Sequence, residues 1–317
     1  MNVSAQVLEV VTQPSGRPIS NAIRAVGDAL SKKYGPSALG VLLYGSCLRA
    51  GTDHDSLVDC YVLVDDYASV YQKSWLALCN RWLPPNVFYW EVPVEERVVR
   101  VKYAVLSLED FERSVSPQWF HSYFWARFAQ PTVLLVSASQ AVRQRILNGL
   151  GMAALTFLRK SLPRVSGRFT AMELWIAGLS LSYGAELRAE STGRADALWK
   201  SDGEYYEQLT HAVFSSHFPD VQVVPQQEGR AYVFEGTGWE RFSNRMGWIL
   251  RRWQGKILSV LRLMKGAFTF QGGIDYLLWK IERHSGVNIQ LTPAQRRHPI
   301  LTGLRTFWRL YRQGAFR

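Results

Sequence analysis

Residues 42–66 read LLYGSCLRAGTDHDSLVDCYVLVDD, and this stretch decides the fold. An apolar run of strand length, Leu39 to Tyr44, is interrupted by Gly45-Ser46. A polar loop from Arg49 to Ser56 follows, and a second β-rich run extends from Leu57 to Val64. Apolar runs that are bounded by glycine and polar clusters predict a strand, a tight turn and a second strand.

The residues at this turn suit phosphate chemistry. Glycine allows backbone N–H groups to approach a triphosphate closely, and the Ser46 hydroxyl can donate a hydrogen bond to a phosphate oxygen. Asp59 lies on the second predicted strand, where its carboxylate could hold Mg²⁺ ions that bridge phosphates during an in-line displacement. The plainer alternative is that Gly45-Ser46 is only a turn and that Asp59 caps a strand.

A second acidic residue is missing from the predicted strand. The turn and the acid are typical of DNA polymerase β-like nucleotidyltransferases, which usually carry two acids two residues apart. Tyr61 stands at the partner position in this sequence. Asp53 and Asp55 in the intervening loop could supply the missing oxygen ligands, or they could cap the loop. We therefore predict a magnesium site at Asp59 with Asp55 and Asp53 as the further candidate ligands.

The chain divides into an α+β part, a helical part and a basic tail. We predict a nucleotidyltransferase domain with a mixed sheet over residues 1–136, a mostly helical domain over 137–238 and a basic amphipathic segment over 239–317. The predicted helices cover Ile19–Tyr34, Tyr71–Trp82, Leu108–Phe128, Ser139–Arg159, Ala171–Arg188 and Ala195–Phe214. The further predicted strands cover Val87–Val92, Val98–Leu106, Val133–Val136, Val221–Val224 and Ala231–Phe234.

The positive charge is concentrated in the tail. The chain of 317 residues has a formal net charge of +11 from 37 Lys+Arg and 26 Asp+Glu. Residues 239–317 hold 15 Lys+Arg and 3 Asp+Glu, so the tail carries +12 and the remainder −1. This asymmetry indicates a polyanionic partner, either nucleic acid or anionic lipid. The three cysteines form neither a disulfide framework nor a zinc pattern, and each is expected to be a small buried apolar residue.

Further motifs follow the second strand in order along the chain. They read NVFYW at 86–90, VKYAVLS at 101–107, YFWARFAQP at 123–131, IAGLS at 176–180 and YGAELR at 183–188. With YGS at 44–46, VD at 58–59 and VDD at 64–66, they resemble the mitochondrial-type phosphatidate cytidylyltransferases, the translocator assembly and maintenance family of CDP-diacylglycerol synthases. The resemblance covers residues 40–190 and extends loosely into the tail. Cys47, Glu91 and two inserted residues at Leu181-Ser182 depart from it and concern the finer nucleotide contacts.

The resemblance implies a reaction in which CTP and phosphatidate give CDP-diacylglycerol and pyrophosphate with Mg²⁺. It implies that Tyr44, Gly45 and Ser46 hold the CTP phosphates and that Asp59 ligates the metal. A phosphate monoester is already anionic near neutral pH, so this reaction does not demand a strong general base. The missing second strand acid is then less important than it is for a hydroxyl nucleophile.

The resemblance also implies two charge clamps. Lys102 and Arg127 would neutralise the triphosphate or the phosphatidate head group. Glu186 and Arg188 are further candidates for binding the nucleotide, and their spacing of two does not favour a salt bridge between them on a helix. Two plainer alternatives stay open, because Lys102 could extend to solvent from an apolar strand and Arg127 could be a cation at a helix end.

The tail has the pattern of an interfacial helix. Apolar residues repeat at helical spacing through 250–264 and again through 301–311, and basic residues surround both stripes. Cationic helices with Trp and Leu on one face lie in the lipid headgroup plane, and each cation near an anionic leaflet contributes about 1 kcal/mol. The alternative is a helix that docks on the catalytic domain with a solvated basic face. The predicted membrane contacts include Trp253, Trp308, Arg305 and Arg309.

The leading hypothesis is a peripheral CTP:phosphatidate cytidylyltransferase on the inner, cytoplasmic membrane face, with a lipid rather than a nucleic acid as partner. The chain lacks a transit-peptide pattern, which favours a bacterial member; a trimmed mitochondrial form on the matrix face is the alternative. Two other hypotheses stay open. One is a nucleotidyltransferase that acts on RNA or on a small-molecule or protein hydroxyl, and the other is a non-catalytic membrane-binding module. An oligomer is compatible with all three.

Overall fold

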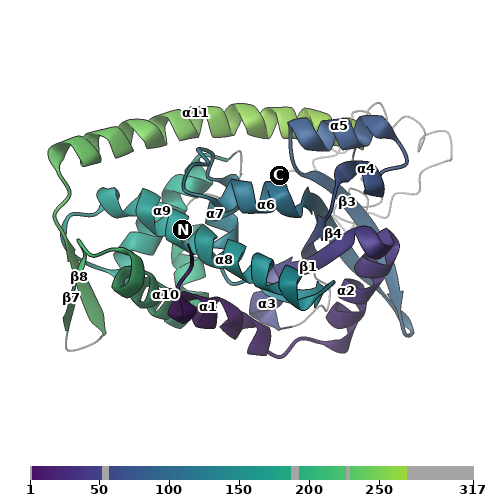
Figure 1. The fold of residues 1–317 in the computed structure, drawn as a ribbon, viewed down its shortest axis with the longest axis horizontal. Coiled ribbons are helices and arrows are strands. Elements are labelled where there is room, and N and C mark those ends of the chain that lie inside the picture. Colours follow the sequence, from purple (N-terminus) through teal and green to yellow (C-terminus); the bar gives the residue numbers. More distant parts are fainter. Residues whose placement is uncertain (1, 52–56, 187–192, 226–228, 270–317) are drawn as a thin grey trace, which may run out of the picture.

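The computed structural model describes residues 2–51, 57–186, 193–225 and 229–269. A mixed sheet of five strands lies at one end of the molecule, and helices and a second, smaller sheet make up the rest (Figure 1). The protein is therefore α+β, as the sequence predicts, and the particular nucleotidyltransferase fold stays a prediction. The division into three segments also stays a prediction.

The large sheet has the strand order β3-β4-β2-β1-β5. Only β2 and β4 run parallel, and the other neighbours are antiparallel. The strand predictions are confirmed within one or two residues at each end. The five strands are β1 (Ala38–Tyr44), β2 (Val58–Val64), β3 (Asn86–Val94), β4 (Arg97–Ser107) and β5 (Val133–Ser137).

Most predicted helices are confirmed, but the helix predicted over Leu108–Phe128 is two separate helices, and the helix at Ala5–Thr12 was not predicted. Those of eight residues or more are α1 (Ala5–Thr12), α2 (Asn21–Tyr34), α5 (Ser74–Trp82), α6 (Leu108–Val115), α8 (Gln140–Ser161), α9 (Ala171–Gly184), α10 (Arg194–His217) and α11 (Gly238–Thr269). The shorter ones are α3 (Ser46–Ala50), α4 (Tyr67–Val70) and α7 (Tyr123–Phe128). Helix α9 ends at Gly184, before the predicted end at Arg188.

Both faces of the large sheet are covered, because side chains alternate between them along each strand. One face, with Val41, Leu43 and Val62, packs against α2. The opposite face, with Leu42 and Leu63, belongs to a core that continues into the helices after residue 136. This second face carries the candidate site.

The second sheet was predicted only in part. It contains β6 (Gly167–Thr170), β8 (Arg230–Phe234) and β7 (Gln222–Pro225) in the order β6-β8-β7, with antiparallel pairs. The sequence indicated β7 and β8 but not β6. A strand of four residues is too short to show an alternating pattern of its own.

The prediction of a loop from Arg49 onward is wrong at its start. Gly45 has φ +91° and ψ −155°, a conformation open essentially to glycine alone, and the chain turns there directly into α3. The Arg49 backbone N–H donates to the Gly45 carbonyl at 3.4 Å. The turn therefore places Ser46 and Arg49 on a helix, three residues apart.

Candidate active site

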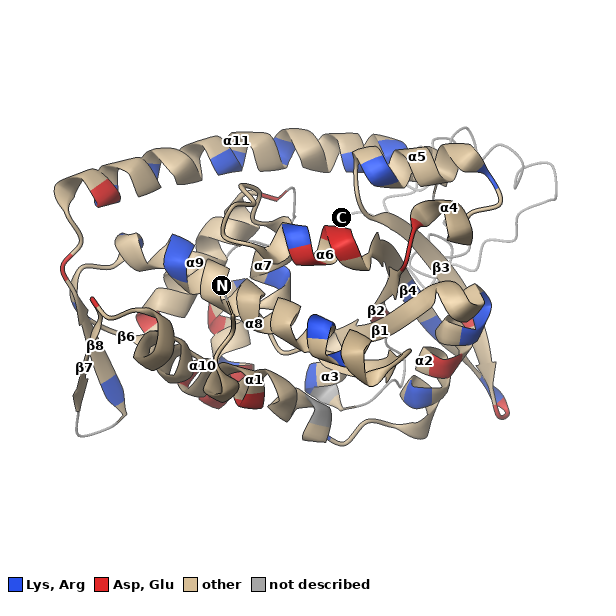
Figure 2. Cartoon of the chain, viewed as in Figure 1, with Lys and Arg blue, Asp and Glu red and all other residues tan. Residues whose placement is uncertain are grey.

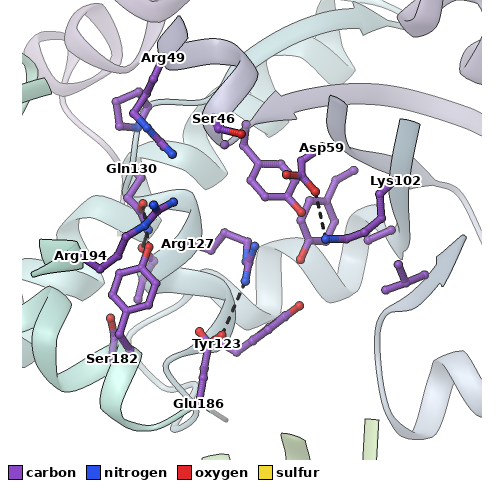
Figure 3. A pocket seen from close by; sticks show the side chains of 18 of the residues that line it. Ser46, Arg49, Asp59, Lys102, Tyr123, Arg127, Gln130, Ser182, Glu186 and Arg194 are labelled. Atoms are coloured by element: carbon purple, nitrogen blue, oxygen red, sulfur yellow. Dashed lines mark hydrogen bonds and ion pairs between the residues drawn. The ribbon is translucent and has the colours of Figure 1, made fainter. Parts of the chain in front are cut away.

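The strands bring the predicted residues to one pocket of about 710 Å³ (Figure 3). In the sheet register, Asp59 lies opposite Tyr44 on β1 and opposite Lys102 on β4. Neighbours in register point to the same face of a sheet, so these three side chains face the pocket together. Gly45 and Ser46 line the same pocket.

The Gly45 backbone lies so close to the Asp59 carboxylate that a side chain at this position would crowd it. A Cβ atom at this position would lie 3.1 Å from Asp59 Oδ2. Burial raises the pKa of the neighbouring Tyr44, and the charge of Asp59 raises it further. The Tyr44 hydroxyl therefore stays protonated beside the carboxylate and is available as a hydrogen-bond donor.

Lys102 forms an ion pair with Asp59, with 3.1 Å between Nζ and Oδ1. The two side chains are 34% and 21% exposed, so the pair lies at the wall of the pocket rather than in open solvent. Lys102 therefore does not simply extend to solvent, because its ammonium group is paired with the Asp59 carboxylate in the pocket. Apart from this ion pair, Asp59 Oδ1 accepts no hydrogen bond in the described part of the chain, and a carboxylate oxygen has a further lone pair for a ligand.

Arg127 lies in the last turn of α7 and extends into the pocket, so its place at a helix end does not exclude a place in the site. Its guanidinium lies 5.3 Å from the ring centroid of Tyr44 and 4.7 Å from that of Tyr123. Glu186 pairs with it at 3.8 Å. Burial alone would lower the pKa of Arg127, but the neighbouring tyrosines and Glu186 raise it, so the residue stays charged.

The remaining predicted residues lie outside the described residues. These are Asp53, Asp55 and Arg188, and in the tail Arg305, Trp308 and Arg309. Within the described residues, no three His, Cys, Asp or Glu side chains lie close enough together to hold a metal ion by themselves. One carboxylate nevertheless suits Mg²⁺, which commonly takes one or two carboxylates and completes its shell with water and substrate phosphates. The Asp59 carboxylate, which lines the same pocket as Ser46, fits this mode.

Two arginines in the pocket were not predicted. Arg49 comes from α3 and Arg194 is the first residue of α10. The spacing of Arg49 three residues after Ser46 could have indicated it once α3 was known to be a helix. Arg194 has no such signal, because only the packing of α10 places it at the pocket.

Helix α11 docks beside the pocket through its polar side chains. Arg251 Nε donates to the Phe120 carbonyl at 2.8 Å, and Trp248 Nε1 donates to that of Lys160 at 3.0 Å. Arg262 Nε donates to the Pro84 carbonyl at 3.0 Å. Of the basic residues predicted around the apolar stripe, Arg251 and Arg262 therefore bind the protein itself, whereas Arg252 and Lys256 are exposed.

The outward face of α11 carries large apolar side chains among basic ones. Trp253, Ile257 and Met264, from the predicted stripe, are all exposed. The helix carries seven Lys+Arg and one acidic residue, Glu240 (Figure 2). The alternative of a docked helix is thus confirmed as to docking, and the solvated face carries both basic residues and the apolar stripe. Trp82, at the end of the adjacent helix α5, adds a large exposed apolar side chain. None of the described helices is long and apolar enough to cross a membrane.

The apolar helix and the pocket are in contact. Leu263 of α11 lines the pocket and is itself exposed. The neighbouring Arg262 guanidinium lies 4.3 Å from the ring centroid of Tyr123, whose ring also contacts Arg127. The rim of the pocket and the outward face of α11 therefore form one continuous region.

Comparison with known proteins adds no family assignment. No protein-family model matches the chain, and no curated protein sequence matches it.

Proposed function

We propose that the protein is a Mg²⁺-dependent CTP:phosphatidate cytidylyltransferase. One observation carries the proposal: the pocket with Ser46, Asp59 and Lys102 is also lined by Leu263, on a helix whose outward face exposes large apolar side chains among basic ones. The residues that suit phosphate chemistry and the surface that suits lipid are thus adjacent, because Leu263 belongs to both. A water-soluble substrate needs no such surface, whereas phosphatidate is itself part of a membrane.

In the proposed reaction, a phosphate oxygen of phosphatidate attacks the α-phosphorus of CTP in line. The new P–O bond forms while the bond from the α-phosphorus to the bridging oxygen breaks, and pyrophosphate leaves with the bond electrons. Ser46 donates a hydrogen bond to a phosphate oxygen, and Lys102 and Arg127 stabilise negative charge in the transition state. When bound at Asp59, Mg²⁺ neutralises phosphate charge and polarises the phosphorus.

The basic and apolar residues of α11 suit attachment to an anionic membrane surface. Trp253 is 67% exposed and Ile257 is 58% exposed, and both would enter the interface. The exposed cations Arg252 and Lys256 lie near them on the same helix and would contact lipid phosphates. We infer a peripheral enzyme on the inner, cytoplasmic face of a membrane.

Release of pyrophosphate from CTP tests the proposal. Purified protein with Mg²⁺, CTP and phosphatidate vesicles should release pyrophosphate and form CDP-diacylglycerol. Turnover with RNA or a small-molecule hydroxyl in the absence of lipid would instead support a different nucleotidyltransferase. A chain that binds vesicles and turns over no nucleotide would support a membrane-binding module.

A further inference from the structure

Among the described residues that line the pocket, cationic side chains outnumber carboxylates. Four cationic side chains line it, Arg49, Lys102, Arg127 and Arg194, and two carboxylates, Asp59 and Glu186. Both carboxylates already pair, one with Lys102 and the other with Arg127. Within the described residues, neither remaining arginine forms an ion pair. The excess charge of the pocket therefore lies at these two arginines.

Arg49 and Arg194 come from different parts of the chain and share one side of the pocket. Figure 3 shows their side chains extending toward each other, on the side away from the Asp59–Lys102 pair. Burial raises the pKa of Tyr206 on α10, and the charge of Arg49 opposes this rise, so Arg49 also acts on α10. Two guanidinium groups that line one pocket, neither of them paired with a carboxylate of the described residues, favour a polyanionic ligand.

Arg49 is also linked to the predicted phosphate turn. Ser46 and Arg49 are three residues apart on α3, and residues at this spacing are neighbours on a helix surface. A phosphate chain that begins at Ser46 therefore continues toward Arg49 and then Arg194. The opposite side of the pocket, with Lys102 and the rim residue Leu263, is left for the acceptor.

We propose that Arg194, together with Arg49, binds the terminal β- and γ-phosphates of the nucleotide and the pyrophosphate that they become. This inference rests on the proposed function and names the part of the site that takes the leaving group. As the bond from the α-phosphorus to the bridging oxygen breaks, the electrons pass to pyrophosphate, and the two arginines stabilise the added charge. Arg194 reaches the pocket from the helical part of the chain, so the nucleotide bridges that part and the sheet.

Ligands of graded phosphate length test the role of Arg194 without lipid. Isothermal calorimetry on the full chain with Mg²⁺ would measure the binding of pyrophosphate, CTP and CMP to the wild type and to Arg194→Gln and Arg49→Gln. Loss of a charge-assisted contact should weaken pyrophosphate and CTP binding by about 10-fold or more. CMP has no terminal phosphates, so its affinity should change by less than about 2-fold.

Two further variants serve as controls. Arg168→Gln removes an exposed arginine of β6, which does not line the pocket, and should bind all three ligands like the wild type. Arg194→Lys keeps the charge and should recover part of the pyrophosphate affinity. Thermal midpoints close to that of the wild type would show that each variant folds.

Equal losses for CMP and CTP would overturn the inference, because they would place Arg194 at the nucleoside or the α-phosphate. Unchanged pyrophosphate binding in Arg194→Gln would also overturn it. So would a variant that binds CTP normally and shows only a raised KM for dioctanoyl-phosphatidate, since Arg194 would then hold the acceptor. A wild type that binds CTP through Arg194 but transfers nothing to phosphatidate would contradict the proposed function alone.

Discussion

Replacing Gly45 by alanine changes the backbone and the site at once. Gly45 has φ +91° and ψ −155°, where a residue with a Cβ atom is strained by about 1–3 kcal/mol. The added Cβ would lie 3.1 Å from Asp59 Oδ2, closer than ordinary contact distance. The carboxylate must therefore shift by a few tenths of an ångström, away from its present place beside Lys102.

These two effects predict separate changes in stability and in turnover. Backbone strain should lower the thermal midpoint by about 2–4 °C for each kcal/mol. Displacement of Asp59 should lower the rate of pyrophosphate release by about 10–100-fold, because small misplacements of reacting groups have effects of this size.

Gly35→Ala is the matched control for strain. Gly35 has φ +58° and ψ −139°, and an added Cβ there would have no atom within 4 Å. Differential scanning calorimetry should show comparable losses of stability for the two variants, whereas only Gly45→Ala should lose turnover. Wild-type turnover in Gly45→Ala would refute the placement of the reacting phosphate at this turn.

Three further predictions concern other parts of the site and its surroundings. Lys102→Met should reduce kcat at saturating CTP by about 100-fold or more, and a rate near that of the wild type would exclude Lys102 from the chemistry. The double variant Trp253→Ser, Ile257→Ser removes about 2–4 kcal/mol of the free energy of transferring apolar side chains into the membrane. Its affinity for anionic vesicles, measured by co-sedimentation, should therefore fall about 30-fold or more. The two side chains are 67% and 58% exposed, so the thermal midpoint should stay unchanged. Burial, then the charges of Arg262 and Arg251, lower the pKa of His121 to about 3, below its ordinary value of 6.5. As the pH falls below 6.5, the imidazole takes up a proton in the unfolded chain but stays neutral in the folded one. The free energy of unfolding should therefore fall by about 1.4 kcal/mol per pH unit from 6.5 toward 3. His121→Gln should lack this dependence on pH in urea titrations.

The strands and most helices could be predicted because each carries its own local pattern. The run before Gly45 is apolar and of strand length, and β1 ends at Tyr44 as expected. Helix α2 ends at Tyr34 because Gly35 takes a positive φ there. The short strand β6 and the helix α3 lack such patterns and were missed or assigned to a loop.

The site itself depended on contacts that no local pattern encodes. Asp59 and Lys102 meet because β2 and β4 pair in parallel, in a register that the sequence does not specify. Arg194 reaches the pocket only through the packing of α10.

The orientation of helix α11 likewise could not be predicted from its own sequence pattern. Its apolar stripe was evident in the sequence, but its orientation depends on the backbone carbonyls of Pro84, Phe120 and Lys160, which accept hydrogen bonds from its polar residues. Three distant segments thus determine which face points outward.

The most direct test of the central claim is pyrophosphate release from CTP by the full chain with Mg²⁺ and phosphatidate vesicles, compared with Asp59→Asn. We predict CDP-diacylglycerol and pyrophosphate in equal amounts from the wild type and a rate lower by several orders of magnitude in the variant, which keeps the size of the side chain and removes its charge. Equal rates in the two proteins, or no pyrophosphate from a folded wild type that binds the vesicles, would contradict the account.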